Sequence, residues 1–160
     1  MLPYDKIAKR YEDLYGAEQL RKNMIAGMFL DGAKNVLDVG CGTGMLGSLL
    51  RATEYYICLD LSRGMLNVFK RKNLTVLGDA VRADAGNLPF RDRSFDGVAC
   101  ITVLHEAINA MMEIARVIKP GGKIAVSIRK VFDSKVDLTR MRIEKVIESG
   151  GDDIFLLKAQ

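Results

Sequence analysis

The stretch Val36-Leu37-Asp38-Val39-Gly40-Cys41-Gly42-Thr43-Gly44 decides the fold of this 160-residue chain. A short apolar run over residues 35–39, bounded by turn-forming residues, predicts a buried strand. Three glycines follow within five residues, and a helix is expected over residues 45–51. Glycine allows positive φ angles and lets a ligand lie against the main chain, while the first N–H groups of a helix can bind anionic groups. The stretch therefore predicts a ligand-binding turn.

The sequence around this turn alternates between expected helices and strands. Further helices are expected over residues 4–15, 18–29, 63–72, 107–118 and 136–149, and strands over residues 55–60, 80–84, 95–101, 123–128 and 154–158. The alternation predicts one α/β domain over residues 1–160, a Rossmann-like three-layer sandwich with a mostly parallel sheet and helices on both faces. Only one helix and one strand are expected after residue 128, which predicts a sheet shortened at its C-terminal end.

The composition argues against several classes of protein. No apolar run reaches the ~18 residues of a membrane span, and the charged, aromatic start is unlike a secretory signal. Cys41, Cys58, Cys100 and the single His105 have no spacing typical of a metal site, so no metal is expected. A reducing cytoplasm is the simplest location. The net charge of +4 fits a lysine-rich surface better than an obligatory anionic partner, although a nucleic acid remains possible.

Two classes of ligand fit the glycine turn. The run from Gly42 to Gly47 reads G-x-G-x-x-G, and Asp60 follows Gly42 by 18 residues, as in a dinucleotide-binding oxidoreductase. Asp38 separates the alternatives. A carboxylate two residues before Gly40 would repel a pyrophosphate but attract the ammonium group of an amino-acid-like ligand. The residues thus favour the second class.

From Asp38 to Gly44 the chain resembles motif I of the class I S-adenosylmethionine-dependent methyltransferases. The resemblance continues in order over roughly residues 4–128, through Leu59–Leu66, Asp84–Phe90, Phe95–Glu106 and Ile118–Gly122. It implies a Rossmann-like fold, S-adenosyl-L-methionine as the cofactor and transfer of its methyl group to an acceptor.

The resemblance also implies roles for the residues of the turn. Asp38 would hold the amino group of the cofactor, and Asp60 would accept hydrogen bonds from its ribose hydroxyls, unless Asp60 only caps a helix. The residues expected to lie against the methionine and ribose parts of the cofactor are Gly40, Cys41, Gly42 and Gly44.

Adenine would be bound farther along the chain. By the resemblance, Leu61 and Met65 pack against the ring, Asp84 accepts from its amino group, and the Ala85 N–H reaches a ring nitrogen. Asp79 is an alternative to Asp84, because the sequence around it also reads like the end of a strand. The spacing to the following Leu-Pro-Phe run favours Asp84.

Three more positions complete the expected site. Tyr11 would touch the cofactor carboxylate or, alternatively, pack on the sheet. Thr102, at the end of the fourth expected strand, is assigned to the cofactor site. His105, followed by Glu106, would lie at the rim where the acceptor binds, and it would remove a proton during transfer unless it is only a surface residue.

The acceptor is not determined by these residues. A small molecule is favoured over a protein side chain or tRNA. The alternative is a non-catalytic subunit that binds S-adenosylmethionine within a larger methyltransferase complex. Residues 154–157 form the last expected strand and have no expected hairpin mate. They predict an edge that a second copy or a partner subunit covers, or that Lys158 and the chain end protect.

Overall fold

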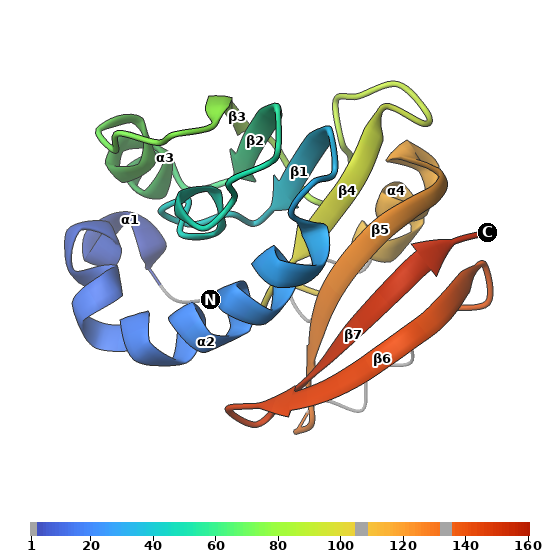
Figure 1. Cartoon of the computed structure of the whole chain (residues 1–160). Coiled ribbons are helices and arrows are strands. Elements are labelled where there is room, and N and C mark those ends of the chain that lie inside the picture. The colour runs from blue at the N-terminus through green and yellow to red at the C-terminus, as the bar shows by residue number, and fades with distance from the viewer. Residues whose placement is uncertain (1–2, 105–108, 132–135) are drawn as a thin grey trace.

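The computed structural model describes residues 3–104, 109–131 and 136–160. Within these residues the strands form one seven-stranded sheet in the order β3-β2-β1-β4-β5-β7-β6. Strands β1 to β5 run parallel to one another, and β7 runs antiparallel to both β5 and β6 (Figure 1). The strands are β1 Asn35–Val39, β2 Tyr55–Asp60, β3 Leu77–Arg82, β4 Phe95–Cys100, β5 Ile118–Arg129, β6 Met141–Ser149 and β7 Asp152–Ala159; the helices are α1 Tyr4–Ile7, η1 Ala8–Arg10, α2 Tyr11–Leu30, η2 Leu46–Ser48, α3 Arg63–Lys70 and α4 Ala110–Val117.

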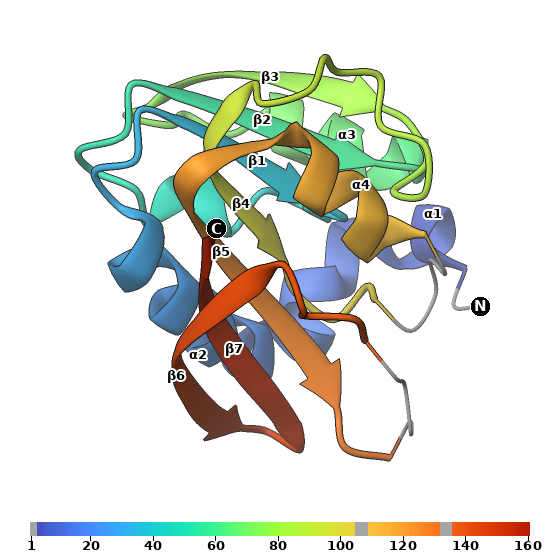
Figure 2. The same ribbon diagram turned by 90° about the vertical axis from the view of Figure 1, so that its right-hand side faces the viewer.

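Helices cover both faces of the sheet, because side chains alternate between the faces along each strand. On β1, Val36 belongs to the apolar cluster formed with α2, η2 and α3, whereas Leu37 and Val39 belong to the cluster formed with α4. Figure 2 shows α2 and α4 on opposite sides of the strands. The expected three-layer α/β fold is confirmed.

The strands on either side of the glycine turn match the sequence prediction, but the helices near them differ. β1 and β2 have the expected bounds, and Ser62 caps α3 by accepting a hydrogen bond from Met65 N at 3.1 Å. Helix α2 continues through Gly16, where a break was expected; a Cβ there would meet only Glu12 Cβ, at 3.8 Å. After the turn, η2 is a three-residue 3-10 helix rather than the longer helix expected.

The helix expected over residues 136–149 is wrong. The structure instead has β6, which pairs antiparallel with β7 and forms a hairpin at the end of the sheet (Figure 1). The C-terminal end is therefore not shortened. β7 lies between β5 and β6, so the edge expected at residues 154–157 is wrong as well. The edge strand on this side is β6, where Ile143 and Val146 are about half exposed.

A buried ion pair joins the first long helix to the last strand. Lys22 Nζ of α2 lies 2.9 Å from Asp152 Oδ2 of β7, and both side chains are fully buried. Glu18 and Arg129 extend the pair, with Glu18 Oε1 2.7 Å from Lys22 Nζ and Arg129 Nε 3.4 Å from Asp152 Oδ1. This network fixes α2 against the sheet.

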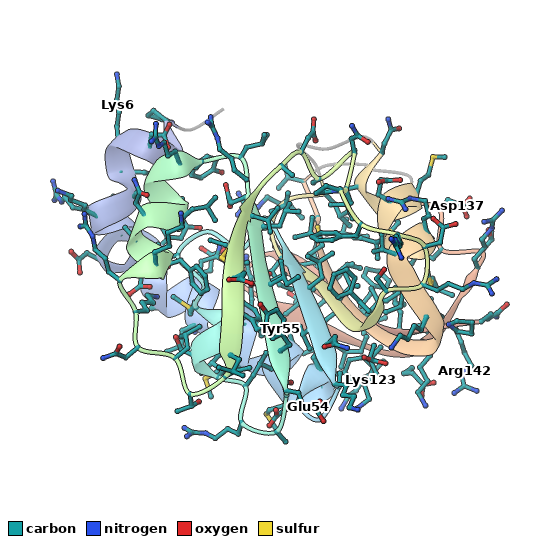
Figure 3. All side chains as sticks on the ribbon, turned by 90° about the horizontal axis from the view of Figure 1, so that it is seen from above. Lys6, Glu54, Tyr55, Lys123, Asp137 and Arg142 are labelled. Atoms are coloured by element: carbon teal, nitrogen blue, oxygen red, sulfur yellow. A yellow bond between two sulfur atoms is a disulfide. The ribbon has the colours of Figure 1, made fainter. Side chains whose placement is uncertain are left out.

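Many charged side chains lie on the outside of the molecule (Figure 3). In Figure 3, Lys6 projects from α1 and Arg142 projects from β6 at the opposite end. In the part of the chain that the structure describes, no helix has both the length and the apolar character needed to cross a bilayer.

Candidate cofactor site

The glycine turn lies at the carboxyl ends of β1 and β2, and the main chain of β2 holds it there. Gly40 N and Cys41 N both donate to Leu59 O, at 2.7 and 3.0 Å. Gly40, Gly42 and Gly44 have φ angles of 70°, 56° and 76°, a region that side chains disfavour. The turn therefore depends on glycine at these three positions.

The space around the three glycines differs. A Cβ on Gly40 would lie 2.2 Å from Val103 Cγ2, and one on Gly44 would lie 2.2 Å from Phe69 Cδ2. A Cβ on Gly42 would meet nothing within 4 Å. The middle of the turn is therefore an open cradle of bare backbone that a ligand can approach closely.

Asp60 supports this cradle from the end of β2. Its Oδ2 accepts from Gly42 N at 2.9 Å, and its Oδ1 accepts from Ser62 N at 2.8 Å. The loop that follows β3 meets the same residue, since Ala83 N donates to Asp60 O at 3.3 Å. One aspartate thus joins the turn, the start of α3 and the loop after β3. Because a carboxylate has about four acceptor positions, it can still accept from ligand hydroxyls.

Asp38 is a buried carboxyl group that lines the pocket beside the turn. Its side chain accepts a hydrogen bond from Tyr56 Oη at 2.5 Å, and Tyr56 is itself fully buried in β2. Burial raises the pKa of Asp38 to about 7; the hydrogen bond from Tyr56 opposes this shift and the charge of Asp60 adds to it. A cationic ligand group would reverse the shift, because an adjacent positive charge favours the ionised form.

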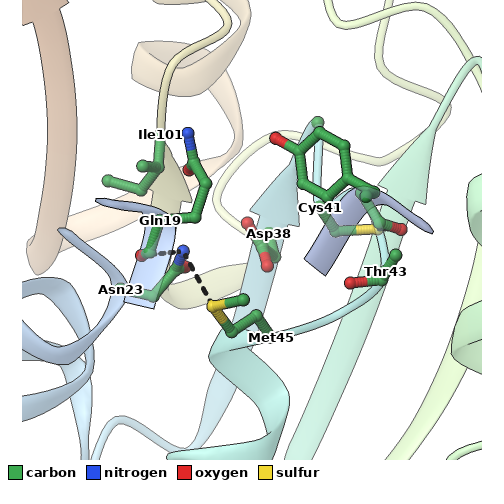
Figure 4. Close-up of a pocket in the computed structure, with 10 residues that line it drawn as sticks. Gln19, Asn23, Asp38, Cys41, Thr43, Met45 and Ile101 are labelled. Carbon is green, nitrogen blue, oxygen red and sulfur yellow. Dashed lines mark hydrogen bonds between the residues drawn. The ribbon is translucent and has the colours of Figure 1, made fainter. Parts of the chain in front are cut away.

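Figure 4 shows Asp38 between the glycine turn and two amide side chains of α2, Gln19 and Asn23. These amides line the pocket and are more than nine-tenths buried. Asn23 Nδ2 donates to Gln19 O at 2.8 Å and approaches Met45 Sδ at 3.9 Å. The predicted residues that line the same pocket are Tyr11, Asp38, Gly40, Cys41 and Gly42. The lining residues that were not predicted from the sequence are Gln19, Asn23, Thr43, Met45 and Ile101. The four-residue spacing of Gln19 and Asn23, which puts both amides on one helix face, was the available signal.

Thr102 has a left-handed backbone with φ of 65°, which is an outlier for a β-branched residue. Its Oγ1 accepts from Gln19 Nε2 at 3.3 Å, and its N–H donates to Ser127 Oγ at 2.6 Å. The surrounding polar groups thus hold a strained residue next to Ile101, which lines the pocket. Such strain is characteristic of functional sites.

The N-terminal segment is fastened over the turn by two carboxylates. Glu12 accepts from Thr43 Oγ1 at 2.7 Å and pairs with Lys72. Partial burial acts to raise the pKa of Glu12, but the hydrogen bonds from Lys72 and Thr43 outweigh it and lower the pKa. Asp5 accepts from Ser62 Oγ and from a backbone N–H of α3, both at 2.7 Å. These contacts place Tyr11 against the pocket.

The residues expected near adenine are distributed around the end of β3 and the start of α3. Met65 is buried and Leu61 is about half exposed. Asp84 follows the carboxyl end of β3 and accepts from the N–H of residue 86 at 2.8 Å, with Ala85 buried beside it. Asp79 lies inside β3 and accepts from Tyr55 Oη. The geometry therefore favours Asp84 over Asp79 as a residue at the ligand-binding end. His105 and Glu106 lie outside the described residues.

Cys41 of the turn is joined to Cys58 of β2 by a disulfide, with the two Cα atoms 5.2 Å apart. The spacing of the cysteines in the sequence predicts no such pairing. They meet because Cys58 lies opposite Asp38 in the β1–β2 register and the turn folds back over β2. Cys100, on the α4 side of the sheet, is buried and free.

The chain matches the family described as "Methyltransferase domain" over residues 37–126. Among its relatives is the demethylmenaquinone methyltransferase of Renibacterium salmoninarum, 35% identical over 134 residues, which cover 78% of this chain and 56% of that protein. The chain thus spans little more than half the length of the curated relatives it matches.

Solved structures show the same architecture. A methyltransferase dependent on S-adenosylmethionine from Aquifex aeolicus has a TM-score of 0.73 at 19% identity, covering 96% of this chain and 97% of that one. A Haloferax volcanii protein described as a methyltransferase, solved in complex with the methyltransferase activator Trm112, has a TM-score of 0.66 at 26% identity, covering 79% of this chain and 60% of that one.

Proposed function

Because this chain belongs to the class I methyltransferases that use S-adenosylmethionine, we propose that it transfers the methyl group of that cofactor to a small-molecule acceptor. The observation that carries the proposal is the open cradle at Gly42, with the carboxyl groups of Asp38 and Asp60 beside the turn.

The donor groups of the site fit the cofactor better than they fit a dinucleotide. S-adenosylmethionine offers an ammonium group, which suits the buried Asp38, and ribose hydroxyls, which suit Asp60. A pyrophosphate would instead face the Asp38 carboxyl group, and the short η2 helix supplies little of the dipole that favours an anion. The oxidoreductase alternative is therefore disfavoured.

The chain contributes mainly binding and alignment. The sulfonium cofactor supplies a methyl group that is already activated for transfer. The glycine turn, Asp38 and Asp60 orient it, while Gln19, Asn23 and Tyr11 form the wall that limits access of water. Alignment of an acceptor behind the methyl group can lower a barrier by about 7–11 kcal/mol. Proton removal by His105 remains part of the proposal for acceptors that carry a proton.

Calorimetry tests the cofactor assignment directly. S-adenosylmethionine and S-adenosylhomocysteine are expected to bind at one site per chain, and NAD is expected not to bind comparably. Tight binding of NAD, with no binding of either sulfur nucleoside, would contradict the proposal.

The small-molecule acceptor draws support from the relatives named demethylmenaquinone methyltransferase. Incubation with methyl-labelled cofactor and a host metabolite extract, followed by mass spectrometry, should yield a labelled small molecule. Label recovered only in protein or tRNA would contradict this choice. A cytoplasmic location is proposed with it.

The alternative is a subunit that binds the cofactor within a larger methyltransferase complex. The likeness to a chain solved with an activator supports it, as does the exposed edge strand β6, where a partner or a second copy can dock. Sedimentation and pulldown from the native host distinguish the two. A monomer that transfers methyl groups alone would rule out the alternative.

A further inference from the structure

We propose that Cys41 and Cys58 form a reversible redox pair whose disulfide holds the glycine turn in its cofactor-binding shape. The proposal makes this pair a site of thiol modification that regulates cofactor affinity. It rests on the proposed function only for the identity of the ligand.

The two cysteines differ in how freely they can move. Cys58 lies inside β2 and is paired with Asp38 of β1 on one side and Ala80 of β3 on the other. Cys41 lies in the glycine turn, between Gly40 and Gly42, which both have positive φ angles. When the bond is reduced, the two sulfur atoms must separate to van der Waals contact. The turn moves, because the strand is held on both sides.

The movement is transmitted to the groups that face the cofactor. Cys41 lines the pocket, and the Sγ atoms of Cys41 and Cys58 lie 3.7 and 3.9 Å from Gly42 O. Reduction creates two thiol donors beside this carbonyl group, which the disulfide lacks. Gly42 N is bound to Asp60, so a rotation of the Gly42 peptide changes both the cradle and the proposed ribose acceptor.

The structure also determines which sulfur reacts first. Cys58 is fully buried, whereas Cys41 is 9% exposed and borders the pocket. The Cys41 thiolate attacks a small-molecule disulfide such as oxidised glutathione, forming a mixed disulfide and releasing one glutathione thiolate. Cys58 then attacks Cys41 Sγ and displaces the second glutathione. Two electrons pass from the protein thiols to glutathione, and the two protons they lose end on the two glutathione thiols.

Cys100 provides a matched internal control. It is buried on the opposite face of the sheet, in the cluster with α4, and burial raises the pKa of its thiol. A thiol in this state is inert. Oxidation should therefore join Cys41 to Cys58 and leave Cys100 unmodified.

The direction of the effect follows from preorganisation. A turn with three glycines loses more conformational freedom on binding than other segments, and a cross-link removes part of that cost in advance. We expect S-adenosylhomocysteine to bind the oxidised form about tenfold more tightly, within the usual range of coupling between two sites. Because coupling is reciprocal, saturating S-adenosylhomocysteine should change the value of [GSH]²/[GSSG] at half-oxidation by the same factor.

The experiment uses the full chain in glutathione buffers of graded ratio. Alkylation followed by intact and peptide mass spectrometry measures the disulfide, and calorimetry measures the dissociation constant of S-adenosylhomocysteine in fully oxidised and fully reduced protein. Cys58→Ala cannot form the disulfide and should bind S-adenosylhomocysteine in the reducing buffer about as tightly as the reduced wild type. In the oxidising buffer its Cys41 should be recovered as the mixed disulfide with glutathione, because no second thiol displaces it. Cys100→Ala should keep the wild-type response.

Absence of a Cys41–Cys58 disulfide, cross-linking through Cys100 instead, or equal affinity of the oxidised and reduced wild type would overturn the inference. These results leave the proposed function intact as long as the ligand binds. Failure of S-adenosylhomocysteine to bind either form would overturn the proposed function and the coupling together. The wild-type comparison needs no substitution, so poor folding of a variant cannot decide the result.

Discussion

Tyr56 Oη donates a 2.5 Å hydrogen bond to Asp38 Oδ2, and both residues are buried beneath the glycine turn. Burial favours the protonated form of this carboxyl group, and the hydrogen bond from the phenol favours the ionised form. Tyr56 is a positioning residue, since it acts on the cofactor through Asp38.

Tyr56→Phe removes this hydrogen bond and should raise the pKa of Asp38 further. Cofactor binding is expected to weaken by about 1.5–3 kcal/mol, the range for a hydrogen bond to a charged group. Calorimetry with S-adenosylhomocysteine measures the effect. Tyr55→Phe is the matched control, because Tyr55 donates a solvent-exposed hydrogen bond to Asp79 of the edge strand β3. Equal affinities of the two variants would refute the positioning role.

The stability of the ligand-free protein should depend on the protonation of Asp38. Its pKa rises from 3.8 in the unfolded chain to about 7 when folded. The folded state therefore holds the proton more tightly, and this contribution is complete below pH 4 and lost as the pH rises through 7. Between pH 5 and 8 the free energy of unfolding of the wild type should fall by on the order of 2 kcal/mol relative to that of Asp38→Asn. Denaturant titrations at each pH test this, and parallel pH profiles would be the contrary result.

Asp60→Ala should weaken binding of S-adenosylhomocysteine by ~1.5–3 kcal/mol through loss of the ribose acceptor. Asp79→Ala is the control. Asp79 lies inside β3, opposite Ile57 of β2, and not at the carboxyl ends of the strands where the turn lies. The dissociation constants of both variants, measured by calorimetry, should differ by about tenfold or more. An unchanged constant for Asp60→Ala would remove this residue from the site.

Gly40→Ala should abolish cofactor binding and destabilise the fold, because the new Cβ would lie 2.2 Å from Val103. Gly32→Ala separates strain from collision, since Gly32 has a φ of 89° and open space around it. Thermal unfolding should show an excess destabilisation of Gly40→Ala of about 1–3 kcal/mol, the usual cost of overpacking. If the two variants unfold alike, Val103 does not restrict the turn.

The central strands and the glycine turn could be predicted because their signals are local. An apolar run bounded by turn residues defines β1. The spacing from Gly42 to Asp60 is set within a single unit in which a strand, a helix and a second strand follow one another. The contact between Asp60 Oδ2 and Gly42 N shows that residues 18 apart in sequence meet as that unit requires.

A helix was expected where β6 lies, because the pattern of apolar residues in this strand depends on its pairing with β7. As an edge strand it is largely exposed, and a register irregularity lies between Ile143 and Lys145. Its apolar residues 143, 146 and 147 consequently recur at helical spacing instead of alternating. Pairing with β7 overrides the local signal.

The amides of α2 were not predicted as site residues, because their position also depends on a distant part of the chain. Gln19 and Asn23 are polar residues on a helix, where solvent exposure is the usual expectation, yet both are buried against the pocket. Their burial follows from where α2 docks, which residues near them in sequence do not determine. The disulfide likewise depends on the β1–β2 register rather than on the spacing of its cysteines.

The pairing of Lys22 with Asp152 sets an order of assembly. The two residues are 130 positions apart, and docking α2 before β7 is in place would bury the Lys22 ammonium with only Glu18 beside it. Burying a charge without its full set of partners is costly, and contacts between distant parts of a chain form late. Helix α2 carries Gln19 and Asn23, so we expect the pocket wall to form only once β7 is in place. A nascent chain that still lacks β7 is therefore expected to bind the cofactor poorly.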